Sequence, residues 1–186
     1  MEVAVDRKLA PIPWYTYPCI EFLQHRDFSS CLVLEFGGGQ STFWWAERAR
    51  AVVTIEEDRR WHDDLKPRVP SNVELHHVSL ETCIAAIPAL LHGLPHAKYD
   101  VIVIDGLERR ELIGVALQYV ADHGIIIFDD SDGYGFFDET SGIGLNRADF
   151  FGMAPGVHLQ HCTSILFGPD AFAFSSRHPI PIAAVL

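Results

Sequence analysis

The sequence predicts an α/β fold: a single Rossmann-like, doubly wound and mostly parallel seven-stranded sheet with an antiparallel C-terminal hairpin. Two observations carry this prediction. Short apolar runs alternate with helical segments over the first two thirds of the chain, which is typical of a parallel sheet covered by helices on both faces. Two extended runs then follow without a long helix between them, as in an antiparallel pair.

The elements follow one another in a regular order. An entry helix is expected at 18–24. Strands are expected at 31–36, 51–55, 72–78, 99–105 and 124–128, because each run is short, apolar and bounded by glycine or polar residues. Helices are expected at 42–49, 82–91 and 108–121. The runs at 147–151 and 162–167 should pair at one edge of the sheet, and 133–144 should form a polar loop near the strand tips.

Length and composition limit the class of protein. The chain has 186 residues, of which 48% are hydrophobic, so we expect one domain over 1–186 with 1–17 as an N-terminal arm. Because no apolar run approaches membrane-spanning length and no signal-peptide core is visible, we expect a cytoplasmic protein without membrane contact. A net charge of −11 disfavours nucleic acid as a partner. A small molecule is therefore the expected substrate, and a homo-oligomer is left open.

A glycine-rich loop follows the first strand. Glu35 ends the apolar run, and Gly37, Gly38 and Gly39 come directly after Phe36. Glycines allow a sharp turn and let a ligand approach the backbone. The spacing differs from the dinucleotide fingerprint and the loop lacks a Walker lysine. The nearby acid suits a cation or an ammonium group better than a pyrophosphate.

An acid marks the end of the second strand. Glu56 lies 19 residues after Gly37, and an acid about 20 residues beyond such glycines accepts hydrogen bonds from ribose hydroxyls in nucleotide-binding units. The alternative is an ordinary acidic helix start. Together, the loop and the acid predict a ligand that contains a ribose.

Further acids follow two neighbouring strands. Asp105 ends the fourth strand, and Asp129 and Asp130 follow the fifth. Since the carboxyl ends of parallel strands meet at one edge, these three carboxylates should converge, where they repel one another unless protons or a cation intervene. Mg²⁺ prefers oxygen ligands, so the pattern predicts a magnesium site. Solvent-facing positions for Asp129 and Asp130 are the alternative.

Other polar and aromatic residues have candidate roles. Asp132 is a candidate general base, and Arg109 could orient an anionic or polyhydroxy substrate or form an exposed ion pair. His158 and His161 are interpreted as structural because no third ligand accompanies them. An aromatic lid could come from Trp14, Tyr15, Tyr17 and Tyr134, whereas Trp44 and Trp45 are expected in the core.

Over residues 18–168 the chain resembles the class I S-adenosylmethionine-dependent methyltransferases. The family's first motif is matched by the acid and glycines of the loop, its ribose-binding acid by Glu56, its fourth-strand acid by Asp105, and its C-terminal hairpin by the tail. Ser41 departs from the pattern, because many members carry a third glycine there. The resemblance implies S-adenosylmethionine as the cofactor. The implied cofactor-binding residues are Glu35, Gly37, Gly38, Gly39, Ser41, Glu56, Ser79 and Asp105.

Within that class, the acids resemble those of metal-dependent O-methyltransferases of the macrocin type, and the segment 105–109 resembles small bacterial methyltransferases. This resemblance implies methylation of a small-molecule or sugar hydroxyl. Mg²⁺ would be held by Asp105, Asp129 and Asp130, with Asp105, Asp132 and Arg109 as catalytic residues. The alternatives are a metal-independent methyltransferase, an aminopropyltransferase-like enzyme and a non-catalytic module that binds the cofactor or a partner. An aminopropyltransferase would need an acidic motif after the fourth strand, and this sequence lacks that motif.

Overall fold

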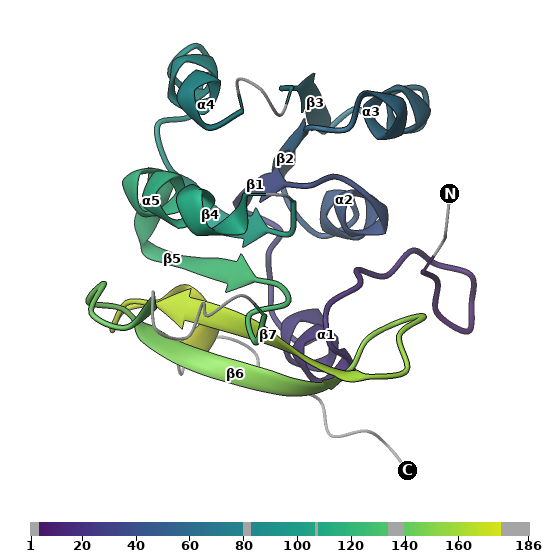
Figure 1. Cartoon of the computed structure of the whole chain (residues 1–186), viewed down its shortest axis with the longest axis vertical. Helices are drawn as coiled ribbons and strands as arrows, with labels where there is room; N and C mark the ends of the chain where they lie inside the picture. The colour runs from purple at the N-terminus through teal and green to yellow at the C-terminus, as the bar shows by residue number, and fades with distance from the viewer. Residues whose placement is uncertain (1–3, 80–82, 107, 134–139, 176–186) are drawn as a thin grey trace.

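The computed structural model describes residues 4–79, 83–106, 108–133 and 140–175, and it confirms the predicted architecture (Figure 1). A seven-stranded sheet has the strand order β3-β2-β1-β4-β5-β7-β6. The first five strands are parallel, and β7 pairs antiparallel with both β5 and β6. The strands are β1 (Leu32–Phe36), β2 (Ala51–Glu56), β3 (Val73–His77), β4 (Tyr99–Ile104), β5 (Val120–Phe128), β6 (Asn146–Met153) and β7 (Gln160–Phe167).

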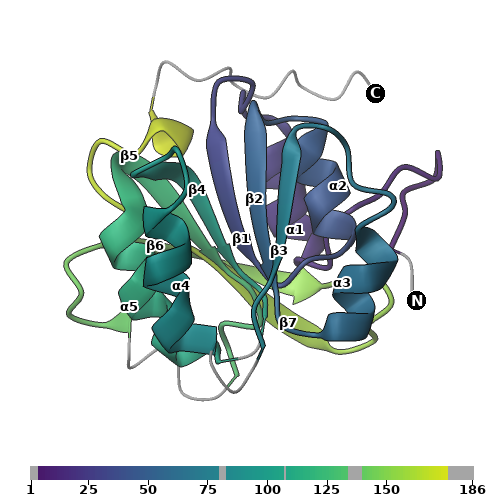
Figure 2. The same cartoon turned by 90° about the horizontal axis from the view of Figure 1, so that it is seen from above.

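Helices cover both faces of the sheet (Figure 2). They are α1 (Tyr17–Gln24), α2 (Gln40–Ala46), α3 (Arg59–Leu65), α4 (Cys83–His92) and α5 (Arg109–Tyr119), with a 3₁₀ helix η1 at Phe172–Phe174. Buried apolar side chains form one cluster under α4 and α5 and a second under α1 and α2. Successive strand residues such as Val33 and Leu34 enter opposite clusters, because side chains alternate across a sheet.

The register brings three strand ends level with one another. Phe36 of β1 pairs with Ile104 of β4, and Ile104 pairs with Phe128 of β5. The residues that follow these strands therefore start from one edge. The strand order reverses between β1 and β4, and open α/β sheets bind ligands outside the strand ends at such a point.

Two elements differ from the sequence-based expectation. The helix α3 was not anticipated, although Asp58 marks its start by accepting hydrogen bonds from the backbone of Arg60 and Trp61. The strand β5 begins four residues earlier than predicted. Gly124 lies inside it, where a Cβ would come within 2.8 Å of the carbonyl oxygen of Asp100. The glycine therefore marks close backbone approach rather than the start of the strand.

Other expectations on burial are met. Trp44 and Trp45 are packed in the core, with exposed fractions of 2% and 0%. Among the described residues, no helix combines the length and the apolar character that a membrane span needs.

Candidate active site

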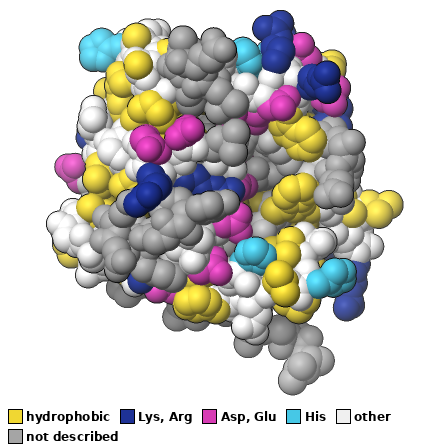
Figure 3. Space-filling model, in the orientation of Figure 1, with side chains coloured by type: hydrophobic (Ala, Val, Ile, Leu, Met, Phe, Trp, Pro, Cys, Tyr) yellow, Lys and Arg dark blue, Asp and Glu magenta, His cyan; other side chains and the backbone are white. Residues whose placement is uncertain are grey.

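A cavity of about 660 Å³ opens where β1, β2, β4 and β5 end, within the usual size range of small-molecule sites. In the space-filling view, acidic and basic side chains lie side by side near the centre of the face seen in Figure 1 (Figure 3). Most of the site residues predicted from the sequence line this cavity: Gly37, Gly38, Gly39, Ser41, Glu56, Asp105, Arg109, Asp129 and Asp130. Glu35, Ser79 and Asp132 do not line it.

The environments of Gly37 and Gly39, the first and last glycines of the loop, differ. Gly37 has φ +90°, and a Cβ there would lie 2.7 Å from the backbone of Asp105 and Gly106. The fold itself therefore requires glycine at this position. Gly39 is extended, with φ −179°, and the nearest atoms to an added Cβ are 4.0 Å away in the ring of Trp61. The space beside Gly39 is thus open toward the cavity.

Glu35 contacts the glycine loop indirectly, through the hydroxyl of Thr42. Its side chain is fully buried, and its Oε2 accepts hydrogen bonds from Thr42 Oγ1 at 2.6 Å and Thr54 Oγ1 at 2.8 Å. Thr42 Oγ1 in turn accepts a hydrogen bond from the backbone nitrogen of Gly39 at 3.0 Å. Burial raises the pKa of Glu35 to about 6, although hydrogen bonds to the hydroxyls oppose the shift. Glu35 therefore fixes the loop through Thr42, and its predicted position near an ammonium group stays a prediction.

Glu56 lies between the glycine loop and the start of α3. Its Oε2 accepts a hydrogen bond from Gly38 N at 2.7 Å, and its Oε1 accepts one from Asp58 N at 2.8 Å. Burial raises the pKa of Glu56 to about 7. Each carboxylate oxygen has two lone pairs, so both oxygens keep an acceptor position at the cavity wall. The arrangement is compatible with the predicted contact to ribose hydroxyls.

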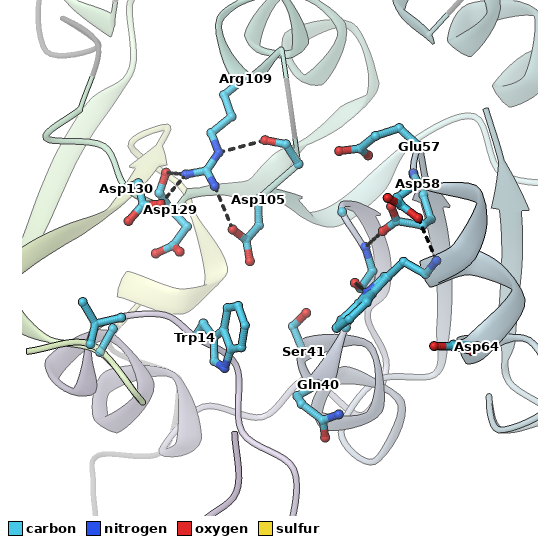
Figure 4. Close-up of a pocket in the computed structure, with 18 of the residues that line it drawn as sticks. Trp14, Gln40, Ser41, Glu57, Asp58, Asp64, Asp105, Arg109, Asp129 and Asp130 are labelled. Atoms are coloured by element: carbon cyan, nitrogen blue, oxygen red, sulfur yellow. Dashed lines mark hydrogen bonds and ion pairs between the residues drawn. The ribbon is translucent and has the colours of Figure 1, made fainter. Parts of the chain in front are cut away.

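The three strand-tip acids lie together, as predicted, but Arg109 lies among them (Figure 4). Its Nη2 donates to Asp105 Oδ1 at 3.2 Å, and its Nη1 donates to Asp130 Oδ2 at 2.9 Å and to the carbonyl oxygen of Asp129 at 2.7 Å. In the described part of the chain, no group of three or more His, Cys, Asp or Glu side chains is arranged to hold a metal ion. The structure therefore does not support the predicted magnesium site, because the guanidinium of Arg109 lies between the carboxylates of Asp105 and Asp130.

Asp129 is the least exposed of these acids. It is 5% exposed, and its Oδ1 accepts a hydrogen bond of 2.6 Å from Thr163 Oγ1 on β7. Burial, together with the neighbouring Asp130, raises the pKa of Asp129 to about 6. Burial also raises the pKa of Asp105, although Arg109 opposes the shift. Figure 4 shows the carboxylates of Asp105 and Asp129 directed into the space above Trp14.

Two predicted site residues lie elsewhere. The Oδ1 of Asp132 accepts a hydrogen bond of 3.0 Å from Cys162 N, so this side chain joins the turn after β5 to β7. Ser79 is exposed just beyond β3. Neither residue lines the cavity.

Among the lining residues that were not assigned to the site from the sequence, His161 and Trp61 make polar contacts there. His161 on β7 lines the cavity, and its Nδ1 lies 3.2 Å from Asp130 Oδ1. Trp61 on α3 also lines it, and its Nε1 donates a hydrogen bond to the carbonyl oxygen of Gly38. The cap at Asp58 could have indicated a helix that carries Trp61, whereas nothing local in the sequence brings His161 to the strand tips.

The N-terminal arm closes one side of the cavity. Its backbone is anchored on the hairpin, since Thr16 N donates to Thr163 Oγ1 at 2.9 Å and Thr16 Oγ1 donates to the carbonyl oxygen of Phe150 at 2.8 Å. This places Trp14 in the cavity wall. Of the other residues predicted to form an aromatic lid, Tyr15 is buried against Trp45, Tyr17 is exposed outside the cavity, and Tyr134 lies outside the described residues.

Comparison with known proteins gives a family match. A family model described as a methyltransferase domain matches residues 34–131, which include the glycine loop and all three strand-tip acids. No curated protein matches the chain.

Solved structures share the fold at low sequence identity. The O-methyltransferase TomG from Streptomyces achromogenes, solved with S-adenosylmethionine (SAM), is 17% identical over 80% of this chain and 76% of its own, with a TM-score of 0.59. An O-methyltransferase from Bacillus cereus, solved with S-adenosylhomocysteine (SAH), is 15% identical over 81% and 78%, with a TM-score of 0.60. A precorrin-6y C5,15-methyltransferase from Geobacter metallireducens is 16% identical over 89% and 94%, with a TM-score of 0.62. This likeness shows the fold of the chain. The names of these three proteins indicate more than one kind of methyl acceptor.

Proposed function

The chain belongs to the methyltransferase-domain family, whose model matches more than half of it, and on this premise we propose that it transfers the methyl group of S-adenosylmethionine to a hydroxyl oxygen of a small molecule. One observation carries the proposal. A single cavity joins an open glycine loop and a buried acid beyond β2 to buried carboxylates beyond β4 and β5.

The cofactor would occupy the half of the cavity formed by β1 and β2. The open space beside Gly39 suits the methionine part of the cofactor, and the free lone pairs of Glu56 suit its ribose hydroxyls. The lining of this half includes four acids, Glu56, Glu57, Asp58 and Asp64, and one base, Arg60. An acidic wall favours a ligand that carries a sulfonium and an ammonium charge. Two structural neighbours were solved with SAM and with SAH, which supports SAM as the cofactor.

The acceptor would occupy the half between the arm and the hairpin. Trp14, Ala154 and Val157 give this half an apolar wall, and Asp105, Asp129 and Arg109 give it a polar one. Such a mixture suits an aromatic or sugar-like ring that presents a hydroxyl to the strand tips. Several of the structural neighbours are O-methyltransferases, which supports oxygen as the acceptor atom.

Asp129 replaces Asp132 as the candidate general base. The sulfonium methyl is already activated, so the protein must align the acceptor and remove its proton. In this step the acceptor O–H proton passes to the Asp129 carboxylate, the oxygen–methyl bond forms, and the methyl–sulfur bond breaks with its electron pair left on a neutral thioether. Thr163 holds one oxygen of Asp129, which fixes the orientation of the carboxylate.

The test compares Asp129→Asn with Asp132→Asn in turnover on a panel of phenolic and sugar hydroxyl acceptors, with methylated product measured by mass spectrometry. We expect Asp129→Asn to lower kcat by roughly 10²–10⁴-fold, the usual contribution of a general base, while SAH affinity is kept. Asp132→Asn is the matched control. A folded Asp132→Asn variant should keep kcat within about tenfold of the wild type. Equal loss in the two variants would remove Asp129 from the base role.

The competing mechanism is the magnesium assistance that the sequence predicts. The same turnover assay with excess chelator separates the two mechanisms, because a metal-assisted reaction stops and resumes when Mg²⁺ is restored. If none of the acceptors is methylated although SAM binds, the proposal of O-methyl transfer fails for these classes.

A further inference from the structure

We propose that the guanidinium of Arg109 takes the place that the sequence assigns to magnesium, so that the carboxylates of Asp105 and Asp130 are paired with a cation of the protein itself. The inference deepens the proposed function and rests on it for its catalytic meaning. Its central claim concerns metal binding, however, and can be tested without any turnover.

The position of Arg109 is the first argument. It begins α5, and its side chain returns toward the strand tips. Its Nη2 contacts Asp105, which ends β4, and its Nη1 contacts Asp130, which follows β5. A divalent ion bridging the carboxylates of these two strand tips would need the same space. Charge-assisted hydrogen bonds of this kind are among the strongest in proteins.

The guanidinium is also held firmly. Besides the contacts to the acids, Nε donates to the carbonyl oxygen of Gly106 at 2.8 Å and Nη1 to that of Asp129 at 2.7 Å. Four of the five N–H groups of an arginine thus have partners, and 18% of the side chain is exposed. An exposed arginine in a simple surface pair lacks such contacts. Arg109 is therefore part of the wall of the cavity.

Four of the six carboxylate oxygens of these acids are committed to separate partners. Asp105 Oδ1 and Asp130 Oδ2 contact Arg109, Asp130 Oδ1 contacts His161, and Asp129 Oδ1 contacts Thr163. Mg²⁺ needs near-octahedral oxygen ligands at about 2.0–2.1 Å. The oxygens committed to separate partners do not supply this arrangement, and a fixed positive charge repels a second cation.

The backbone supports this arrangement. Glu108, directly before Arg109, and Asp130 both adopt positive φ, at 54° and 50°. Non-glycine residues rarely adopt this conformation, and it persists where the surroundings enforce it. The turn at Glu108 and the turn at Asp130 therefore place Arg109 and Asp130 in contact.

A consequence follows for the acceptor. Without a metal, two adjacent oxygens on the substrate have no ion to chelate, so a catechol has no advantage over a phenol with a single hydroxyl. The acceptor is placed instead by the apolar wall and by the Asp105–Arg109 pair. We therefore expect molecules with one reactive hydroxyl to be methylated as readily as vicinal diols.

The experiment measures Mn²⁺ binding by calorimetry and by electron paramagnetic resonance, with Mn²⁺ as the probe for a magnesium-type site. The wild-type protein should show no specific Mn²⁺ site, and its melting temperature should be unchanged by chelator or by Mg²⁺. Arg109→Ala removes the internal cation and leaves the acids, so it should bind one Mn²⁺ at least about tenfold more tightly than the wild type does, as expected for freed carboxylates. Arg110→Ala, at the exposed neighbouring position, is the matched control and should resemble the wild type.

A double variant, Arg109→Ala with Asp129→Asn, should lose the gained Mn²⁺ site, which places it at the strand tips. Specific Mn²⁺ binding by the wild-type protein that Asp129→Asn abolishes would overturn the inference, and this measurement is independent of how well Arg109→Ala folds. A folded Arg109→Ala variant without any gain in Mn²⁺ affinity would also overturn it. Absence of turnover, in contrast, would count against the proposed function and leave the metal-binding result standing.

Discussion

Two glycines of the loop after β1 allow a paired test, because backbone atoms crowd Gly37 while the space beside Gly39 is open. Gly37→Ala forces an alanine into a conformation with φ +90° and places its Cβ 2.7 Å from the backbone of Asp105 and Gly106. Overpacking of this kind costs about 1–3 kcal/mol, and the unfavourable backbone conformation adds about 1 kcal/mol. The contact involves two backbone segments, so neither side can move away as a flexible side chain would.

Gly39→Ala makes no such contact. Its backbone is extended and the nearest atoms to the new Cβ are 4.0 Å away, so the free energy of unfolding should stay within about 0.5 kcal/mol of the wild type. The new methyl group projects toward the space that the proposed cofactor occupies. Gly39→Ala should therefore weaken SAH binding while the fold is kept.

Thermal unfolding and calorimetry with SAH measure both effects. For Gly37→Ala a loss of about 2–4 kcal/mol corresponds to a fall in Tm of roughly 4–16 °C, given about 2–4 °C per kcal/mol for a protein of this length. For Gly39→Ala we expect a wild-type Tm and SAH affinity reduced at least about tenfold, or about 1.4 kcal/mol. The reasoning is refuted if Gly37→Ala melts like the wild type, or if Gly39→Ala binds SAH with unchanged affinity.

Two further predictions concern buried carboxylates. Because the pKa of Glu56 is raised to about 7 in the folded protein from a usual 4.5, its stabilising contribution is complete below about pH 4.5 and is lost as the pH rises through about 7. SAH affinity should change in the opposite direction, since ionised Glu56 accepts more hydrogen bonds. Melting curves and SAH titrations at pH 5.5 and 8 should show both trends, and Glu56→Gln should flatten them; equal pH dependence in that variant would remove Glu56 as the cause. Thr42→Val deletes the hydroxyl that donates to buried Glu35 and accepts from Gly39. It should lower the free energy of unfolding by about 1–3 kcal/mol, which denaturant unfolding can measure, and a stability equal to the wild type would contradict the support role assigned to Glu35.

Family membership could be predicted from the sequence because its signals are local. The resemblance to class I methyltransferases rested on the glycine loop and on acids placed directly after strands, and the family match confirms it. An acid adjacent to a strand end has its position fixed by that strand. The strand order and parallel register then bring Asp105 and Asp129 to one edge, so their convergence followed from the predicted topology.

The base and metal assignments depended on information that is not local. Asp132 follows Asp129 by three residues, yet the turn after β5 directs its carboxylate to the backbone of Cys162. His161 and Thr163 reach the acids because the hairpin returns alongside β5. Hydrophobic patterns predict that the hairpin exists, but they do not specify which of its side chains faces the cavity.

The sequence by itself determined the layered α/β architecture, the glycine loop and the meeting of acids at one sheet edge, because strand periodicity and strand ends are encoded by neighbouring residues. Only the tertiary structure decided which cationic group lies beside Asp105 and Asp130. A carboxylate pattern is equally compatible with a metal ion, with protons or with an arginine. The choice of Arg109 depends on the turns at Glu108 and Asp130 and on the start of α5 beside β4, which are fixed by the packing of distant segments.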